Sequence, residues 1–190
     1  SVDNIVKSTQ YLSQTIDDFR NFIKEDKEKK VFRISDNINT NLEILKGMIE
    51  YNEITIELDI EENLEIESFP NELTQIIINI INNAKDALKE NEIKNKYIFI
   101  SAKKENDKYI KILIKDNAKG IKSEIINKIF DPYFTTKHQS QGTGLGLYMT
   151  HRIVKESLKG SIDIENITYT YKGETYTGAH FIIKLPYKIT

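Results

Sequence analysis

Hydrophobic residues near the start of the chain recur at alternating spacings of three and four residues, the pattern of a coiled-coil seam. The seam comprises Val2, Ile5, Thr9, Leu12, Ile16, Phe19 and Ile23. It predicts a helix that either pairs with another helix in a dimeric bundle or lies as an amphipathic helix on the following domain. The charged stretch 25–30 predicts a hinge, which divides the chain into residues 1–30 and residues 31–190.

Beyond the hinge, segments of period two alternate with segments of helical period, which predicts a sheet with helices inserted between its strands. Strands are expected at 31–34, 52–60, 64–69, 97–103, 109–116, 161–166 and 179–186. Helices are expected from a cap at Ser35 or Asp36 to Ile49, and at 71–89, 123–129 and 144–158. Residues 105–108 and the Tyr-rich stretch 168–178 are expected to connect hairpins. The sum is an α+β two-layer sandwich with a mixed, mostly antiparallel sheet.

Composition narrows the function classes. The 190 residues carry 27 Lys and Arg against 29 Asp and Glu, which gives no reason to expect nucleic acid or an anionic membrane as a partner. The lack of Cys excludes disulfides, thiolate zinc sites and a Cys nucleophile. No run approaches the ~20 apolar residues of a membrane helix, and the N-terminus lacks a signal-peptide pattern. A cytoplasmic location is expected, and since no Met starts the sequence, a longer, membrane-anchored protein stays open.

Helix 71–89 carries polar residues that an Ile-rich helix does not need. Asn79, Asn83 and Asp86 are spaced i, i+4, i+7 and therefore share one face. Asn is a poor helix former because its side chain competes for backbone hydrogen bonds. Amide oxygens can coordinate Mg²⁺ beside a polyphosphate without adding negative charge. The pattern favours a metal and phosphate site, with a merely solvated polar face as the alternative.

Two further motifs carry candidate chemistry. The segment DNAKG (116–120) places a carboxylate at a strand end with a Gly after it, which suits the amino group of a base but also an ordinary turn. The segment GTGLGL (142–147) opens a helix with three alternate glycines, where free N–H groups bind phosphate. Its spacing is neither the Rossmann fingerprint nor a P-loop. A helix entered through a flexible loop is the alternative.

Taken in order, these segments resemble the catalytic and ATP-binding domain of bacterial sensor histidine kinases. QIIINIINNAKDAL resembles the N box of that family, DNAKG the G1 box, IFDPYFTTK the F box and GTGLGL the G2 box, within residues 31–187. The resemblance implies a Bergerat-type fold, ATP and Mg²⁺ as cofactors, and transfer of the γ-phosphate to a histidine in a two-component phosphorelay. It also implies a homodimer through the N-terminal helix, which looks like half of a phosphotransfer hairpin, and a response regulator as partner.

The same resemblance implies roles for individual residues. Asn79 and Asn83 would be the catalytic pair, with Asn83 as the Mg²⁺ ligand, and Asp116 would bind the adenine amino group. The implied nucleotide-binding set is Asn79, Asn83, Asp86, Asp116, Ala118, Gly120, Ile121, Phe130, Phe134, Thr136, Lys137, Gly142, Thr143, Gly144, Leu145, Gly146 and Leu147. The two Phe would anchor a lid, and the Lys and the G2-box glycines would contact the phosphates.

Two features depart from the family pattern. Ala118 stands where the G1 box normally has Gly, and if that position needs a positive φ, the Ala costs about 1 kcal/mol and lowers affinity for the base. None of His138, His151 and His180 is followed by the acidic residue expected beside a phosphoacceptor. We therefore expect a domain that binds Mg·ATP and phosphorylates a histidine other than its own.

Two other functions stay open. An ATPase of the chaperone or mismatch-repair class would need a Glu on helix 71–89 to activate water, but Glu72 lies more than two turns before Asn83. The second alternative is a degenerate interaction module that signals through its N-terminal helix, and only Ala118 favours this alternative.

Overall fold

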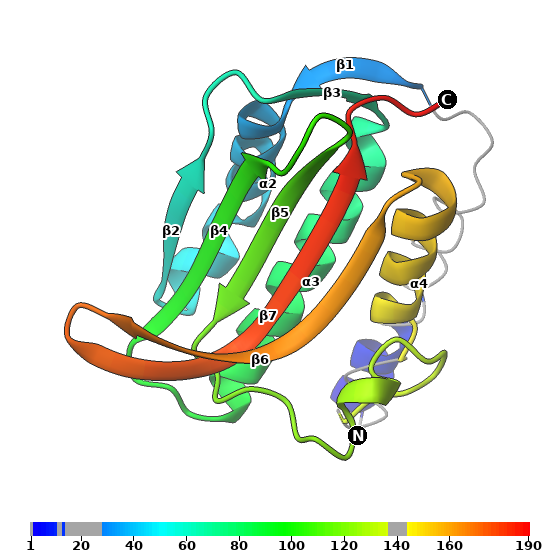
Figure 1. Ribbon diagram of the computed structural model, residues 1–190. Helices are drawn as coiled ribbons and strands as arrows, with labels where there is room; N and C mark the ends of the chain where they lie inside the picture. The colour runs from blue at the N-terminus through cyan, green and yellow to red at the C-terminus, as the bar shows by residue number, and fades with distance from the viewer. Residues whose placement is uncertain (1, 11–12, 14–27, 137–143) are drawn as a thin grey trace.

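A five-stranded sheet with helices on one face forms the body of the protein (Figure 1). The computed structural model describes residues 2–10, 13, 28–136 and 144–190. The strands lie in the order β2-β4-β5-β7-β6, with bounds β2 Ile54–Ile60, β4 Lys96–Lys104, β5 Tyr109–Asp116, β6 Ser161–Tyr171 and β7 Glu174–Pro186. The helices behind them are α2 Ile34–Tyr51, α3 Pro70–Glu90 and α4 Gly146–Arg152, which continues as the π-helical turn η2 Ile153–Ser157. The predicted two-layer α+β arrangement is confirmed.

The sheet is mixed, as expected. β2 and β4 are parallel, because the chain between them crosses over through α3, and every other neighbouring pair in this sheet is antiparallel. A second, two-stranded sheet pairs β1 Lys30–Arg33 with β3 Glu65–Ser68. Both strands were expected from the sequence, but their separation from the main sheet was not. The C-terminal segment closes on β3, where Glu67 donates its N–H to the carbonyl of Tyr187 at 2.7 Å.

The core lies between α3 and the inner face of the sheet. Period-two alternation places Ile110, Ile112 and Ile114 of β5 under the helices, and all three are at most 1% exposed. The apolar face of α3 covers them and is fully buried at Leu73, Ile76, Ile77, Ile80, Ile81 and Leu88. The position of this apolar face leaves the Asn line of α3 at the edge of the core, where it is half-buried.

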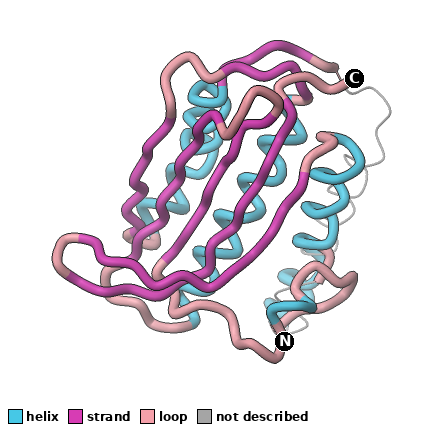
Figure 2. The backbone as a smooth tube through the Cα atoms, in the orientation of Figure 1, coloured by secondary structure: helices cyan, strands magenta, loops and turns pink. Residues whose placement is uncertain are grey.

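Four local expectations differ from the structure. α2 begins at Ile34 with Arg33 as its N-cap and no side-chain cap, because β1 runs directly into the helix; the expected cap at Ser35 or Asp36 is wrong. The helix expected at 123–129 is only the 3₁₀ turn η1 Ile126–Lys128. The helix expected from 144 begins at Gly146. The Tyr-rich stretch is not a loop, since β6 and β7 pair through it to Tyr171 and Glu174 (Figure 2).

The described part of the N-terminal seam is helical over residues 2–10. Val2 and Ile5 are 75% and 67% exposed, so these two seam positions are not buried by other described residues. The seam positions Leu12, Ile16, Phe19 and Ile23 lie outside the described residues. Within the described ranges, no helix combines the length and the hydropathy that crossing a membrane requires.

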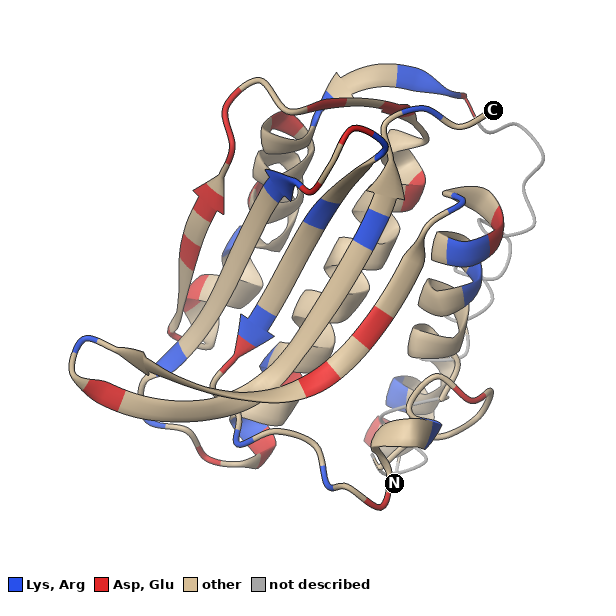
Figure 3. Cartoon of the chain, in the orientation of Figure 1, with Lys and Arg blue, Asp and Glu red and all other residues tan. Residues whose placement is uncertain are grey.

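The strands of the main sheet carry residues of both charge signs (Figure 3), and the burial alternation of β4 and β5 places Lys103 and Lys111 on the face opposite the helices. Lys103 of β4 pairs with Asp59 of β2 at 2.9 Å, and Lys111 and Lys184 both reach Glu105 at 3.1 Å. The Lys103–Asp59 pair is largely exposed and the two pairs with Glu105 are partly exposed, so each contributes little to stability individually. They show that this face is not a surface of a single charge sign.

Candidate functional site

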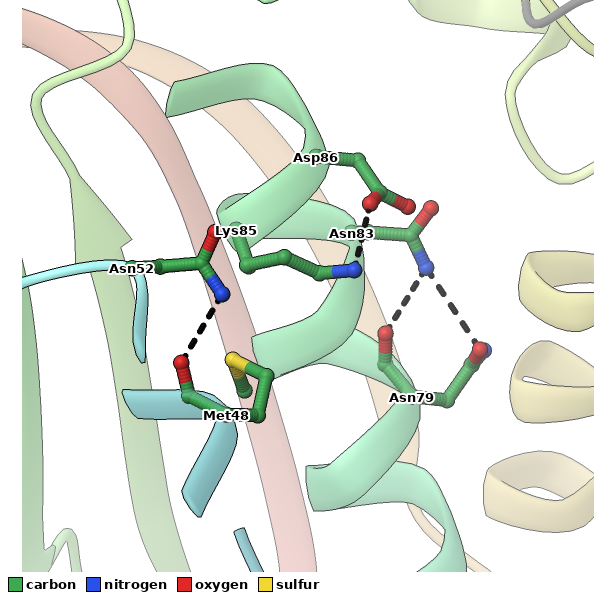
Figure 4. Close-up of polar contacts among 6 residues, drawn as sticks. All are labelled: Met48, Asn52, Asn79, Asn83, Lys85 and Asp86. Atoms are coloured by element: carbon green, nitrogen blue, oxygen red, sulfur yellow. Dashed lines mark hydrogen bonds and ion pairs between the residues drawn. The ribbon is translucent and has the colours of Figure 1, made fainter. Parts of the chain in front are cut away.

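The predicted Asn line lies on one side of α3 and is internally hydrogen-bonded (Figure 4). Asn83 donates from Nδ2 to the backbone oxygen of Asn79 at 2.8 Å. Asp86, one turn further, pairs with Lys85 at 2.7 Å. Because the amide nitrogen of Asn83 is engaged by the helix itself, its Oδ1 is the end of the side chain that remains as an acceptor.

The start of α4 packs directly on this line. Asn79 donates from Nδ2 to the hydroxyl of Thr150 at 2.7 Å, across 71 residues of sequence. A Cβ at Gly146 would lie 2.8 Å from Oδ1 of Asn79, so only Gly fits there without displacing the amide. The structure therefore places Gly146 of the predicted phosphate-binding segment against Asn79 of the Asn line, although no local pattern requires it.

Gly144 serves a different purpose from Gly146. It has φ +73°, and a Cβ there would overlap the backbone of Tyr133. Tyr133 itself adopts φ 64° and is 75% exposed. The backbone of residues 133 and 144 is thus in close contact on either side of the segment 137–143. Lys137, Gly142 and Thr143, which belong to the predicted site, lie outside the described residues.

Asp116 ends β5 and is 3% exposed. Its Oδ1 accepts the N–H groups of Ala118 at 2.9 Å and Ala179 at 3.2 Å. Burial raises the pKa of Asp116 from 3.8 to about 6, because desolvation outweighs these two hydrogen bonds. No described residue donates a hydrogen bond to its Oδ2. A buried carboxylate with one oxygen held in place and one left as an acceptor suits a ligand that offers an N–H donor.

In the turn after Asp116, Lys119 and Gly120 adopt the left-handed backbone conformation, with φ 74° and 80°. Ala118 is not among the residues with positive φ. It is buried, and its carbonyl accepts a hydrogen bond from Asn91 at 3.0 Å. The concern that Ala118 strains this turn is therefore wrong: the position tolerates a side chain, and a non-Gly residue takes the left-handed conformation one position later.

Three other predicted residues pack around the site. Phe130 lies 5.2 Å from the ring of His151 and 6.4 Å from that of Phe181, and Phe134 packs against the core. Leu147 is partly buried against the same core. The two Phe are thus packed in place, whereas Thr136 is exposed and Leu145 is only half-buried.

Sequence reasoning missed several residues that hold the site together. Asn166 of β6 clamps Ile121 by accepting its N–H at 2.8 Å and donating to its carbonyl at 2.7 Å. Asn117 accepts the N–H of Tyr97 at 2.9 Å and donates to the carbonyl of Asn95 at 2.7 Å. A Cβ at Gly178 of β7 would overlap the carbonyl oxygen of Asp116. Each contact joins distant segments, so no periodicity or motif pointed to it.

The fold and this site define a nucleotide-binding domain of a known class. Residues 69–189 match the sequence model of the histidine kinase-, DNA gyrase B- and HSP90-like ATPases, and the chain belongs to that family. The catalytic domain of the histidine kinase ThkA has a similar structure, with a TM-score of 0.70 and 26% identity over 85% of this chain and 97% of that one. The protein is an ATP-binding catalytic domain of the histidine kinase type.

Curated relatives of the chain are named as kinases. Sensor histidine kinase ZraS of Escherichia coli K12 is 34% identical over 154 residues, which is 80% of this chain and 30% of that protein. Sporulation kinase B of Bacillus subtilis is 34% identical over 159 residues, 84% of this chain and 34% of that protein. ThkA in complex with the response regulator TrrA has a TM-score of 0.68 at 22% identity, over 94% of this chain and 49% of that one. The chain spans about a third of the length of these two curated relatives.

Proposed function

We propose that this domain binds Mg·ATP and transfers the γ-phosphate to a histidine other than its own three, in a two-component phosphorelay. The observation that carries the proposal is the contact of Gly146 with Asn79, which joins the glycine-rich helix start to the Asn line of α3. Phosphoryl transfer depends mainly on positioning and on charge stabilisation, so a single cradle for metal and phosphates is what the reaction needs. Asp116 holds the other end of the nucleotide in this proposal, through the adenine amino group.

The residues of the site suit a Mg²⁺ ion that is bound jointly by the protein and a nucleotide, rather than by the protein alone. Among the described residues, no three His, Cys, Asp or Glu side chains lie together as a metal site. Mg²⁺ commonly takes few protein ligands and completes its shell with phosphate oxygens and water. Asn83 would supply the protein oxygen that binds the ion, with Asn79 beside it. The backbone N–H groups at Gly144 and Gly146 would donate to the phosphates. When bound, the ion would neutralise phosphate charge during transfer.

Asn83→Ala tests the metal assignment. The variant is expected to lose at least tenfold in ATP affinity when Mg²⁺ is present and little when it is absent, because only the metal-linked part of binding depends on Oδ1. Calorimetric titration with and without Mg²⁺ measures both. Asn52→Ala is the matched control, since Asn52 also donates to a backbone oxygen four residues earlier, that of Met48 at 2.8 Å, on α2 (Figure 4). Equal losses with and without Mg²⁺ would remove Asn83 from the metal site.

The purified chain is expected to bind ATP without labelling itself. His180 is 8% exposed and lies 3.0 Å from Glu165, and His151 packs on Phe130, so neither presents a free imidazole to a nucleotide. Incubation with γ-labelled ATP should leave the protein unlabelled, and label on any of its three histidines would refute this. Steady release of free phosphate would instead favour the chaperone-type ATPase.

The remaining parts of the proposal concern the whole protein. Residues 1–30 would form a dimerisation segment and hinge, and residues 31–190 the catalytic and ATP-binding domain. The exposed seam positions Val2 and Ile5 support pairing with a second copy, which sedimentation equilibrium tests. ThkA binds a response regulator, and we propose a response regulator as the partner here. A cytoplasmic location is part of the same proposal, because ATP is the phosphate donor.

A further inference from the structure

The β6–β7 hairpin extends past the end of β5 and folds over the uncovered face of the sheet. The last pair between β5 and β7 is Lys115 with His180, so residues 174–179 of β7 have β6 as their only strand partner in the described sheet. Figure 1 shows the hairpin curving across the sheet toward β2. Tyr171, at its end, donates its hydroxyl to Glu57 of β2 at 2.8 Å. The hairpin is therefore fastened to the far edge of the sheet.

Aromatic rings fill the space beneath the hairpin. They are Tyr97 and Phe99 of β4 and Tyr169, Tyr171 and Tyr176 of the hairpin, which we call the aromatic cluster. Tyr171 meets Tyr97 and Phe99 edge-on at 5.0 and 4.9 Å, a favourable geometry. Lys115 places its ammonium 4.1 Å from the ring of Tyr169. The cluster holds the hairpin in one place on this face.

One member of the aromatic cluster, Tyr169, contacts the backbone of Asp116 from the uncovered face of the sheet. Tyr169 donates its hydroxyl to the backbone oxygen of Asp116 at 2.7 Å. The side chain of Asp116 shares the parity of the buried Ile114, so its carboxylate lies on the helix side while the hydroxyl approaches from the uncovered side. Burial and the nearby Asp116 raise the pKa of Tyr169 further above physiological pH, where the hydroxyl is therefore protonated and can donate.

We propose that Tyr169 is a positioning residue that fixes Asp116 for a nucleotide bearing an exocyclic amino group, and so sharpens the choice of adenine. This inference rests on the proposed role of Asp116. The carboxylate is oriented by the N–H group of Ala118 in the following turn and by that of Ala179 in β7. The position of Ala179 depends in turn on how the β6–β7 hairpin is held against the sheet. Loss of the hydrogen bond from Tyr169 to Asp116 then shifts the carboxylate that accepts from the base. The residues proposed to bind the phosphates are not affected.

Tyr169→Phe and Tyr171→Phe form a matched pair for the test. Both remove one hydroxyl and keep the ring in the cluster, but only Tyr169 contacts Asp116. Affinities are measured for ATP and for inosine triphosphate, which lacks the amino group, in the wild type and in Asp116→Asn. Tyr169→Phe should lower ATP affinity about fivefold, the value of one ordinary hydrogen bond, and leave inosine triphosphate unchanged. Tyr171→Phe should change neither.

The double variant separates positioning from a general loss of structure. In the Asp116→Asn background, Tyr169→Phe should have no further effect on ATP affinity, since the residue through which it acts is already disabled. Equal weakening of both nucleotides by Tyr169→Phe, or an undiminished effect in Asp116→Asn, overturns the inference and leaves the proposed function standing. An Asp116→Asn protein that binds ATP as tightly as the wild type overturns the base assignment and the inference with it.

Discussion

Asp116→Asn is expected to weaken ATP binding about 100-fold and, at the same time, to stabilise the folded protein above pH 6. Asn retains an oxygen for the N–H groups of Ala118 and Ala179, but it turns an N–H₂ group toward the proposed adenine amino group, so two donors face each other. The two effects have opposite signs because the buried carboxylate that binds the ligand lowers the stability of the folded protein. Titration calorimetry and denaturant unfolding measure the two effects.

The stability effect has a definite dependence on pH. Burial raises the pKa of Asp116 from 3.8 to about 6, so the folded state binds the proton more tightly than the unfolded state. Wild-type stability therefore falls as pH rises from about 4 to about 6, by roughly 3 kcal/mol at most. Asn removes this penalty, so the gain should be full at pH 8 and absent at pH 4. A variant that is no more stable than the wild type at pH 8 would contradict the role of burial.

Gly178→Ala is expected to destabilise the protein by about 3 kcal/mol and to reduce ATP affinity. The new methyl group would overlap the carbonyl oxygen of Asp116 and lie 2.8 Å from its Oδ1, so β7 must move away. That movement also stretches the hydrogen bond from Ala179 to Asp116. Thermal and denaturant unfolding measure the first effect, and nucleotide titration measures the second.

Gly47→Ala is the control for this substitution. Gly47 lies within α2, and nothing occupies the space that its Cβ would take. The same change should therefore stabilise the protein by about 0.5–1 kcal/mol, because Ala is the better helix former. If Gly178→Ala behaved like Gly47→Ala, the close passage of β7 over Asp116 would be refuted.

Much of the fold was predictable because each element has its own local pattern. β4 carries a continuous apolar run at 97–100, β5 alternates apolar and polar residues beyond the turn at 105–108, and α3 follows Pro70 with an uninterrupted apolar face. The Tyr-rich stretch was not predicted as strand, because its alternation of Tyr and Thr lacks the aliphatic side chains that indicate a buried face. Its apolar side is covered by Tyr97 and Phe99, which come from a strand about 70 residues earlier in the chain.

The sequence by itself determined which residues are proposed to carry the chemistry, since the Asn line, the strand end at Asp116 and the glycine cluster are each recognisable from a few neighbouring positions. Only the tertiary structure decided how they meet. Asn79 contacts Thr150 across 71 residues, Tyr169 contacts Asp116 across 53, and Tyr171 contacts Glu57 across 114. Periodicity specifies the face on which a side chain lies, but not which distant backbone group will lie opposite it. That choice follows from the packing of α4 and of the β6–β7 hairpin, which bury their apolar surfaces against elements far away in sequence.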